Sequence, residues 1–314
     1  FDLMVATAIT TSGQLSIRWI EKSLNIYLNK LLETKNEDYV IASDTDSVYI
    51  TFDKLVDRVF KGGGTPEKIT DFLDKIASEK LEPFILKSYT ALAKTMNAYE
   101  QKMQMSREVI ADKAIWTAKK RYILNAWDIE GVRYKTPQLK IMGIEAVKSS
   151  TPAVCRQKIK DALNIIMTGD EKELNSFIQE FRDEFMNLPP EDIAYPRSCN
   201  GVKKFRGSDR LFLKGTPIHV KGALLYNNRL KKKKLVKYEQ IQEGDKVKFI
   251  VLKEPNPLRE KVISFPTHLP PEFDLHKYIN YDEQFDKSFL EPLRFIVNAI
   301  NWNFEKQANL LDFF

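Results

Sequence analysis

The first part of the chain shows apolar residues spaced as on one face of a helix. From Ile20 to Leu31 they recur three or four residues apart, which predicts an amphipathic helix over about residues 13–32. The run Thr-Thr-Ser at 10–12 supplies side chains that commonly cap a helix N-terminus. We therefore expect the helix to start just after these residues.

Two short apolar runs of strand character follow, separated by polar residues. They occupy 39–42 and 48–50, and the sequence Ser-Asp-Thr-Asp-Ser lies between them at 43–47. This pattern predicts a β-hairpin with Asp44 and Asp46 at its tip. In an extended chain, residues two apart point to the same face, and a hard divalent cation relieves the repulsion between two carboxylates. The same spacing also fits a plain polar turn.

The pattern then alternates between helical and strand character. A helical segment runs from Thr65-Pro66 to about residue 97, as one helix or as two, because Pro83 interrupts it. Residues 100–135 show strand character, including the alternation from Met103 to Val109, and predict a meander of about three strands. A change of pattern near residue 137 indicates a domain boundary there.

The remainder of the chain is predicted to be mostly helical with a small β element. Helices are expected from about residue 152 to 187, followed by a basic, loop-rich segment that contains one helical or extended piece. Two strands at 247–252 and 261–265 and a last helix over about 283–303 complete the prediction.

Charge changes this picture, because it is unevenly distributed. Residues 101–250 carry 30 Lys or Arg and 18 Asp or Glu, a net charge of +12, whereas residues 1–100 and 251–314 each carry −3. A basic middle segment favours a polyanionic partner, although a lysine-rich solvated surface would look the same. No apolar stretch is long enough to span a membrane. The two cysteines lack metal-site spacing and fit a reducing compartment.

Several motifs, taken in order, resemble family B DNA polymerases of the T-even phage type. Residues 39–50 resemble the third polymerase motif of that family, in which Asp-Thr-Asp-Ser joins two apolar strands. Residues 8–14 resemble the segment after the nucleotide-binding helix, and Lys-Lys-Arg-Tyr at 119–122 matches a further family element. Residues 139–152 resemble the start of the thumb. The resemblance covers nearly the whole chain.

This resemblance implies an α+β fold in which a partial polymerase palm, an antiparallel sheet backed by helices, precedes a mostly helical thumb with a small β element. Residues 1–136 would form the C-terminal part of the palm and residues 137–306 the thumb. Residues 307–314 would form a tail that binds a sliding clamp.

The resemblance also implies the catalytic residues. Asp46 would bind both ions of a two-Mg²⁺ site, with Asp44 as the supporting carboxylate. Glu108, which is expected on a strand of the meander, resembles a third acidic residue near the family's site, although its acidic companion is Ser106 here. The family's other essential aspartate lies in a motif with no counterpart in this sequence. We therefore expect the chain to require an N-terminal polymerase polypeptide and to be inactive alone.

Residues that grip DNA are implied in the same way. The resemblance assigns contacts with primer-template DNA to Lys119, Lys120, Arg121 and Tyr122, and further phosphate contacts to Lys140 and Lys148. Lys119, Lys120 and Arg121 are expected to lie on a strand of the meander, and the alternative is that this strand is only a solvated basic surface. The run of lysines at 231–234, followed by Lys237, would either touch the duplex or attract DNA from a distance.

The last residues resemble the peptide by which replication proteins dock on sliding clamps. One helical turn would place Leu310, Phe313 and Phe314 on one side and leave Gln307 free to form hydrogen bonds. The alternative is a terminal segment that folds back onto the thumb.

The implied activity is Mg²⁺-dependent nucleotidyl transfer from a dNTP to a primer 3′-hydroxyl, in the cytoplasm of an infected bacterial host. A non-catalytic alternative is a processivity subunit that binds DNA and the clamp. A reverse transcriptase is a second alternative, but such enzymes place two adjacent aspartates at this hairpin. A nuclease would need further acidic or His ligands, and the three His lie far from the hairpin in sequence.

Overall fold

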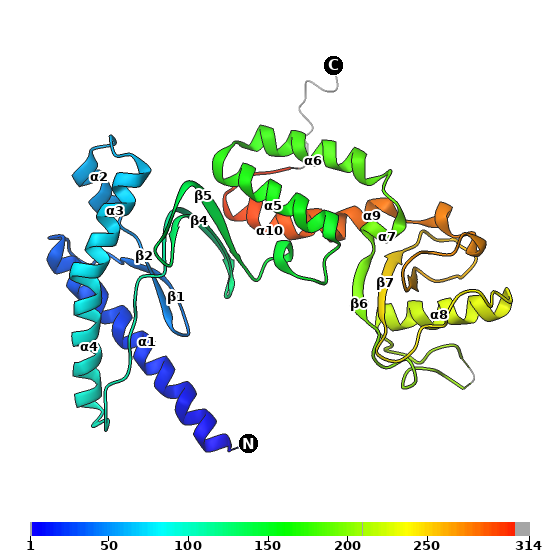
Figure 1. The fold of residues 1–314 in the computed structure, drawn as a ribbon, viewed down its shortest axis with the longest axis horizontal. Helices are drawn as coiled ribbons and strands as arrows, with labels where there is room; N and C mark the ends of the chain where they lie inside the picture. The colour runs from blue at the N-terminus through cyan, green and yellow to red at the C-terminus, as the bar shows by residue number, and fades with distance from the viewer. Residues whose placement is uncertain (1, 209, 305–314) are drawn as a thin grey trace. The chain divides into compact units, whose positions relative to one another are not determined.

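A computed structural model of the chain describes residues 2–208 and 210–304 (Figure 1). It contains helices and small antiparallel sheets, so the α+β prediction is confirmed. The chain divides into two compact units. The first comprises residues 1–114 and 123–140, and the second comprises residues 115–122 and 141–314.

The first unit is built around a long helix, α1 (Leu3–Leu31), whose buried residues are Ile20, Leu24 and Leu28. The predicted start near residue 13 is wrong by about three turns. Asp2 caps the helix, its side chain accepting a hydrogen bond from the backbone N–H of Met4 at 2.8 Å. The expected caps at 10–12 lie inside the helix, where threonine hydroxyls donate to carbonyl groups one turn earlier.

The core of this unit forms where the C-terminal half of α1 packs against the helical stack, by which we mean the helical segment of residues 66–95. Tyr27 and Phe84 are stacked with their ring centroids 4.0 Å apart. The proline-interrupted segment is neither one regular helix nor two separated helices, because a π-helical turn at Ala77–Leu81 joins its halves directly before Glu82-Pro83. The remaining helices of the unit are α2 (Asp53–Phe60), α3 (Pro66–Ile76) and α4 (Glu82–Thr95).

The predicted hairpin and meander are both confirmed. The first is a two-stranded antiparallel sheet of β1 (Val40–Asp44) and β2 (Ser47–Ile50), and the second has the strand order β3-β4-β5. The alternation from Met103 to Arg107 does not form a strand. The turn between β4 and β5 uses Glu130 and Gly131, both with positive φ, which suits a tight hairpin. The strands of the meander are β3 (Val109–Ala118), β4 (Arg121–Ile129) and β5 (Val132–Met142).

The second unit contains a helical layer with an aromatic core. Phe181 packs edge-on against Phe289, with ring centroids 4.8 Å apart, and Phe285 packs against both. The predicted last helix is interrupted by a π-helical turn at Asp286–Leu290, again directly before a Glu-Pro pair. The helices of this layer are α5 (Ala153–Thr168), α6 (Glu171–Phe185), α7 (Pro190–Ile193), α9 (Tyr281–Phe285) and α10 (Glu291–Ala299).

The small β element of this unit is larger than predicted. The two expected strands are present, but β6 (Tyr195–Ser198) pairs with β7 as a third strand. The strand β6 was not predicted because it contains Pro196, and a proline normally argues against a strand. Proline is tolerated here because β6 lies at the edge of the sheet. Helix α8 (Ile218–Lys232) lies along this sheet (Figure 1). The sheet is formed by β6, β7 (Lys246–Val251) and β8 (Val262–Phe265).

Candidate functional site

The acidic hairpin tip is held by the pairing of β1 with β2. Asp44 is the last residue of β1 and lies opposite Ser47, so that Thr45 and Asp46 alone form the turn. Thr45 has a φ of 45°, and the backbone N–H of Asp46 donates to the carbonyl oxygen of Asp44 at 2.5 Å. The hairpin therefore ends in a tight reversal.

This reversal corrects one expectation. Asp44 and Asp46 do not lie on one extended strand, because the chain turns between them, so the argument that extended spacing puts their side chains on one face is wrong. Asp46 is exposed and Asp44 is half-buried. The Thr45 hydroxyl donates to Oδ1 of Asp44 at 2.9 Å, and the Ser47 hydroxyl donates to its backbone carbonyl at 3.2 Å.

The chemistry of these two side chains suits a hard cation in part. Carboxylate oxygens are the ligands that Mg²⁺ prefers, and Asp46 is accessible from solvent. Within residues 2–208 and 210–304, however, no group of three or more His, Cys, Asp or Glu side chains is placed to hold a metal. The hairpin can therefore supply part of an octahedral ligand set, and the other ligands must come from elsewhere.

Glu108 and Lys140, predicted for different roles, form an ion pair. Glu108 lies just before β3, and its Oε1 contacts Nζ of Lys140 on β5. The backbone carbonyl of Glu108 accepts a hydrogen bond from the N–H of Glu130 at 2.7 Å, which fixes this residue beside the β4–β5 turn. The expected strand position of Glu108 is wrong by one residue.

The basic Lys-Lys-Arg-Tyr element forms a turn and the start of a strand. Lys119 and Lys120 are the exposed turn between β3 and β4, not strand residues as expected, and Arg121 begins β4. Tyr122 is buried, with its ring 6.4 Å from that of Trp116. The element thus presents two lysines to solvent and uses its tyrosine for packing.

A single carboxylate, that of Glu145, connects two of the predicted DNA contacts. Arg121 binds it through two parallel contacts, Nη1 to Oε1 at 3.2 Å and Nη2 to Oε2 at 2.7 Å. Nζ of Lys148 lies 2.8 Å from Oε1. Burial on its own would raise the pKa of Glu145, but the hydrogen bonds from Lys148 and Arg121 outweigh it and lower the pKa.

A buried ion network in the first unit was not predicted. Asp128, whose side chain is 1% exposed, contacts guanidinium groups of Arg107 and Arg133, the latter at 3.1 Å. Both arginines also contact Asp74 on α3, at 2.8 and 3.0 Å. The network ties the β4–β5 turn to the helical stack. Its members are scattered over the sequence, so no local pattern could have revealed it.

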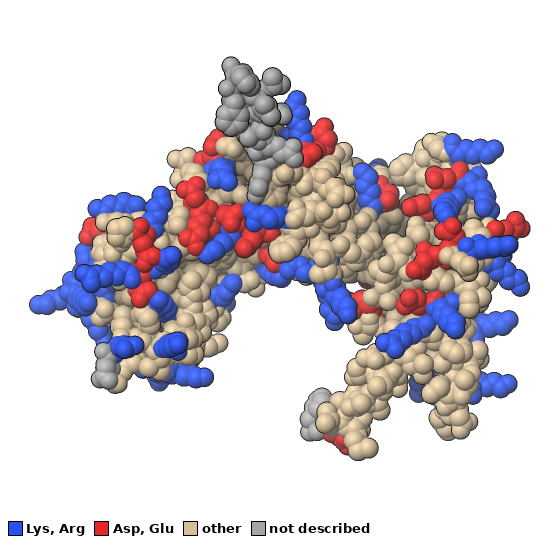
Figure 2. Space-filling view, turned by 180° about the vertical axis from the view of Figure 1, so that it is seen from behind, with Lys and Arg blue, Asp and Glu red and all other residues tan. Residues whose placement is uncertain are grey.

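The predicted lysine cluster lies at the C-terminal end of α8. Lys233 pairs with Asp274 at 2.8 Å and Lys237 with Glu272 at 2.5 Å, whereas all four lysines at 231–234 remain exposed. Figure 2 shows Lys and Arg side chains projecting around the end of the unit that carries α8. This surface retains positive charge after its ion pairs are formed.

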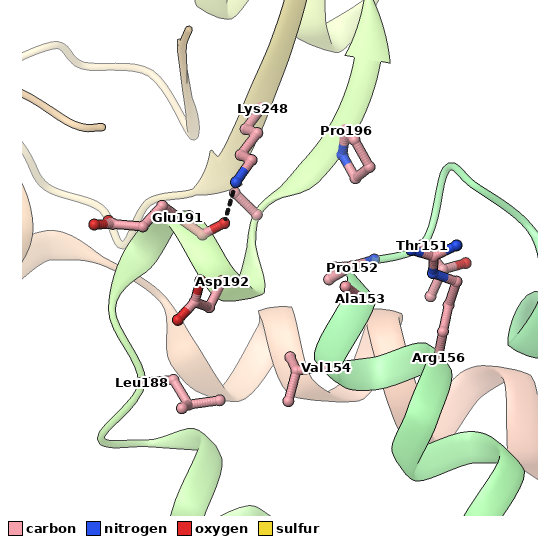
Figure 3. Close-up of a pocket in the computed structure, with 11 residues that line it drawn as sticks. Thr151, Pro152, Ala153, Val154, Arg156, Leu188, Glu191, Asp192, Pro196 and Lys248 are labelled. Atoms are coloured by element: carbon pink, nitrogen blue, oxygen red, sulfur yellow. Dashed lines mark hydrogen bonds between the residues drawn. The ribbon is translucent and has the colours of Figure 1, made fainter. Parts of the chain in front are cut away.

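A cavity of about 230 Å³ opens beside the start of α5 (Figure 3). Lys248 donates from Nζ to the backbone carbonyl of Glu191 at 2.9 Å along its rim. None of the predicted site residues lines the cavity. The lining residues are Thr151, Pro152, Ala153, Val154, Arg156, Leu188, Glu191, Asp192, Ala194, Pro196 and Lys248.

Three predicted features stand outside the sites above. The tail residues Gln307, Leu310, Phe313 and Phe314 lie outside the described residues. The cysteines Cys155 and Cys199 are buried free thiols whose pKa values burial raises to about 11. Among the helices of the described part, none is both long and apolar enough to cross a bilayer.

Comparison with known proteins gives whole-length matches. The chain is 38% identical over 331 aligned residues to a DNA-directed DNA polymerase of Escherichia phage RB69, which covers 100% of the chain. It is 34% identical over 326 residues to a DNA-directed DNA polymerase of Enterobacteria phage T4, which covers 99% of it. The chain spans 36% of the length of each relative. No protein-family profile matches the chain.

Proposed function

The chain is homologous along its whole length to a part of the DNA-directed DNA polymerases of T4-like phages, and we propose that it is the palm and thumb portion of such a polymerase. In this proposal residues 1–136 contribute to the palm, residues 137–306 form the thumb, and residues 307–314 bind a sliding clamp. The reaction is nucleotidyl transfer from a dNTP to the 3′-hydroxyl of primer-template DNA. The observation that carries the proposal is the acidic hairpin within a whole-length match to polymerases.

The hairpin supplies two of the carboxylates that the reaction needs. In the proposed site, Asp46 and Asp44 bind Mg²⁺, and Asp46 is the more accessible of the two. Bound Mg²⁺ supplies Lewis-acid stabilisation of the negative charge on the reacting phosphate oxygens. The tight turn and the β1–β2 pairing restrict the two side chains to the hairpin tip. Glu108, paired with Lys140, contributes as an accessory carboxylate rather than as a main ligand.

The thumb and the basic turn bind the duplex in this proposal. Lys119 and Lys120 are exposed on the β3–β4 turn, and Arg121, Lys140 and Lys148 are each held by a carboxylate neighbour. Such cations neutralise phosphates and release counterions without reading sequence, which suits an enzyme that copies every template. Tyr122 is buried beside the turn, and its ring packs near that of Trp116.

A further polymerase segment completes the site. Two carboxylates are too few to hold two ions, and the chain corresponds to 36% of its relatives. The first turns of α1 extend away from the helical stack (Figure 1) and expose Leu3, Met4 and Ile9 by 78%, 82% and 68%. An exposed apolar strip of this kind supports contact with another polypeptide. We place that partner in the N-terminal part of the polymerase.

The relatives are phage proteins, and we accordingly place the activity in the cytoplasm of an infected bacterial host. The non-catalytic alternative, a DNA- and clamp-binding processivity subunit, makes a different prediction for the hairpin. In that case the two aspartates would have a structural role and would not affect synthesis directly.

The test is Asp46→Asn in the assembly reconstituted with the N-terminal polymerase polypeptide. Primer extension with Mg²⁺ and dNTPs should fall on the order of 100-fold or more, because the amide removes a charged metal ligand. Asp57→Asn, an exposed position on α2, is the matched control and should retain normal extension. Normal synthesis by Asp46→Asn would refute the catalytic proposal and favour the processivity subunit. The chain alone should give no extension.

A further inference from the structure

The basic turn at Lys119–Lys120 packs against the connector, residues 143–152, which joins β5 to α5. Gly143 in this connector has a φ of 67°, and a Cβ at this position would lie 2.1 Å from the carbonyl oxygen of Lys120. No side chain fits there without moving the turn, and the positive φ itself disfavours any other residue. Gly143 therefore allows the backbone of the turn to contact the backbone of the connector.

Two residues further along the connector, Glu145 binds both Arg121 and Lys148. The carboxylate and the guanidinium form two parallel contacts, which fixes the plane of the arginine as well as its position. All three side chains are partly buried, at 23% exposure for Glu145, 29% for Arg121 and 41% for Lys148. Each cation keeps further N–H donors that Glu145 does not use.

We propose that Glu145 and Gly143 are positioning residues that assemble Lys119, Lys120, Arg121 and Lys148 into one preformed phosphate-binding element. The inference rests on the proposed function, in which these four cations contact primer-template DNA. Free Arg and Lys side chains lose much rotamer freedom when they bind a phosphate. Glu145 and Gly143 restrict these side chains before DNA binds, so that less conformational entropy is lost on binding.

This role predicts an effect opposite in sign to simple electrostatics. Glu145→Gln removes one negative charge beside a polyanion site, which by charge alone should tighten DNA binding. If Glu145 instead organises the cations, its loss should weaken binding despite the added positive charge. The pKa of Glu145 is lowered, so the carboxylate is charged at neutral pH. The stability that its ion pairs contribute is lost only in acid, as the pH falls through this lowered pKa.

The experiment measures binding of a fluorescent primer-template duplex to the full chain at neutral pH over a series of salt concentrations. Glu145→Gln should weaken binding about tenfold and reduce the slope of log K against log salt by about two, because two phosphate contacts are no longer held in place. Glu180→Gln is the control, since Glu180 is exposed on α6 and its change adds the same charge. It should bind as tightly as the parent or slightly more tightly.

Gly143→Ala tests the same element without changing charge. It should displace the turn and give a similar loss of affinity, and the double variant with Glu145→Gln should lose little more than either single variant. Glu145→Asp keeps the charge but shortens the side chain, and should recover part of the affinity. Thermal unfolding of each variant shows that the measured protein is folded, and misfolding alone would lower the active fraction without changing the salt slope.

Lys119→Ala and Lys120→Ala separate this inference from the proposed function. Weaker binding by these variants with unchanged or tighter binding by Glu145→Gln and Gly143→Ala would overturn the positioning role and leave the DNA grip intact. Unchanged binding by all of them would overturn both. Weaker binding by the lysine variants and by both positioning variants is the result that we expect.

Discussion

At the scale of single residues, two carboxylates each hold a pair of cations, but in different surroundings. Glu145 is partly exposed and binds Arg121 and Lys148 beside a turn that faces solvent. Asp128 is buried and binds Arg107 and Arg133. Arg121 and Lys148 are partly exposed and can bind a phosphate through their remaining N–H donors while Glu145 holds them, whereas a buried ion must keep its partners. We therefore assign binding to the first cluster and stability to the second.

Asp128→Asn should destabilise the first unit strongly. The amide removes one of the two carboxylates that Arg107 and Arg133 share and leaves Asp74 in place, so we expect a loss of about 1–3 kcal/mol, below the cost of an unpaired buried charge. Urea unfolding measures the change in the free energy of unfolding, and hydrogen exchange of the amides at the β4–β5 turn shows whether the change is local. Asp57→Asn on the exposed face of α2 should change stability by less than about 0.5 kcal/mol. Equal stability of the two variants would contradict the structural role of the network.

At the scale of elements, close backbone contact decides how α8 packs on its sheet. Gly222, in the second turn of α8, faces β8, where a Cβ would lie 2.4 Å from Oγ of Ser264 and 2.7 Å from its backbone nitrogen. The Ser264 hydroxyl in turn donates to the carbonyl of His219 at 2.8 Å. A glycine normally weakens a helix, so its presence here reflects the contact and not the propensity.

Gly222→Ala should consequently destabilise the packing of α8 on β8 by about 1–3 kcal/mol, the usual cost of overfilling a packed contact. Faster hydrogen exchange of the α8 amides measures the effect. Gly13→Ala is the matched control, because Gly13 lies within α1 with nothing near its Cβ position. That variant should slow exchange in α1, since alanine favours a helix by about 1 kcal/mol over glycine. Slower exchange in α8 of Gly222→Ala would contradict the packing argument.

At the scale of the whole molecule, the chain combines surfaces of different chemistry. Residues 101–250 are basic, the first turns of α1 expose apolar side chains, and the last residues resemble a clamp-binding peptide. In the function that we propose, each surface binds one partner: DNA, the remaining polymerase segment or the sliding clamp. Binding to each can be removed separately, because the residues concerned do not overlap.

Removal of residues 307–314 should abolish retention of the polymerase on the sliding clamp of a T4-like phage in a pull-down. Aromatic anchors carry most of the binding energy in such peptides, so Phe313→Ala with Phe314→Ala should reduce retention at least tenfold. Asn309→Ala is the control within the same segment and should be retained. Primer-template binding should be unaffected by all three changes. Equal retention of the full-length and shortened chains would exclude the tail as the clamp anchor.

The structure explains why some elements could be predicted and others not. The hairpin around Asp44, the β7 and β8 strands and the helical core of α1 follow from local periodicity and turn chemistry, which act between neighbouring residues. The start of α1 was missed because threonines that can cap a helix also fit inside it. Strand β6 was missed because its proline is tolerated only through its place in the sheet.

The sequence by itself determined the α+β class, the acidic hairpin, the uneven charge and the resemblance to polymerases, because motifs and periodicity are properties of neighbouring positions. Tertiary structure alone decided which charges pair. Glu145 pairs with Arg121 and Asp128 pairs with Arg107, although the two members of each pair lie more than 20 residues apart in the sequence. The physical reason is that ion pairing depends on distance in space and on burial, and both are fixed only when the chain has folded.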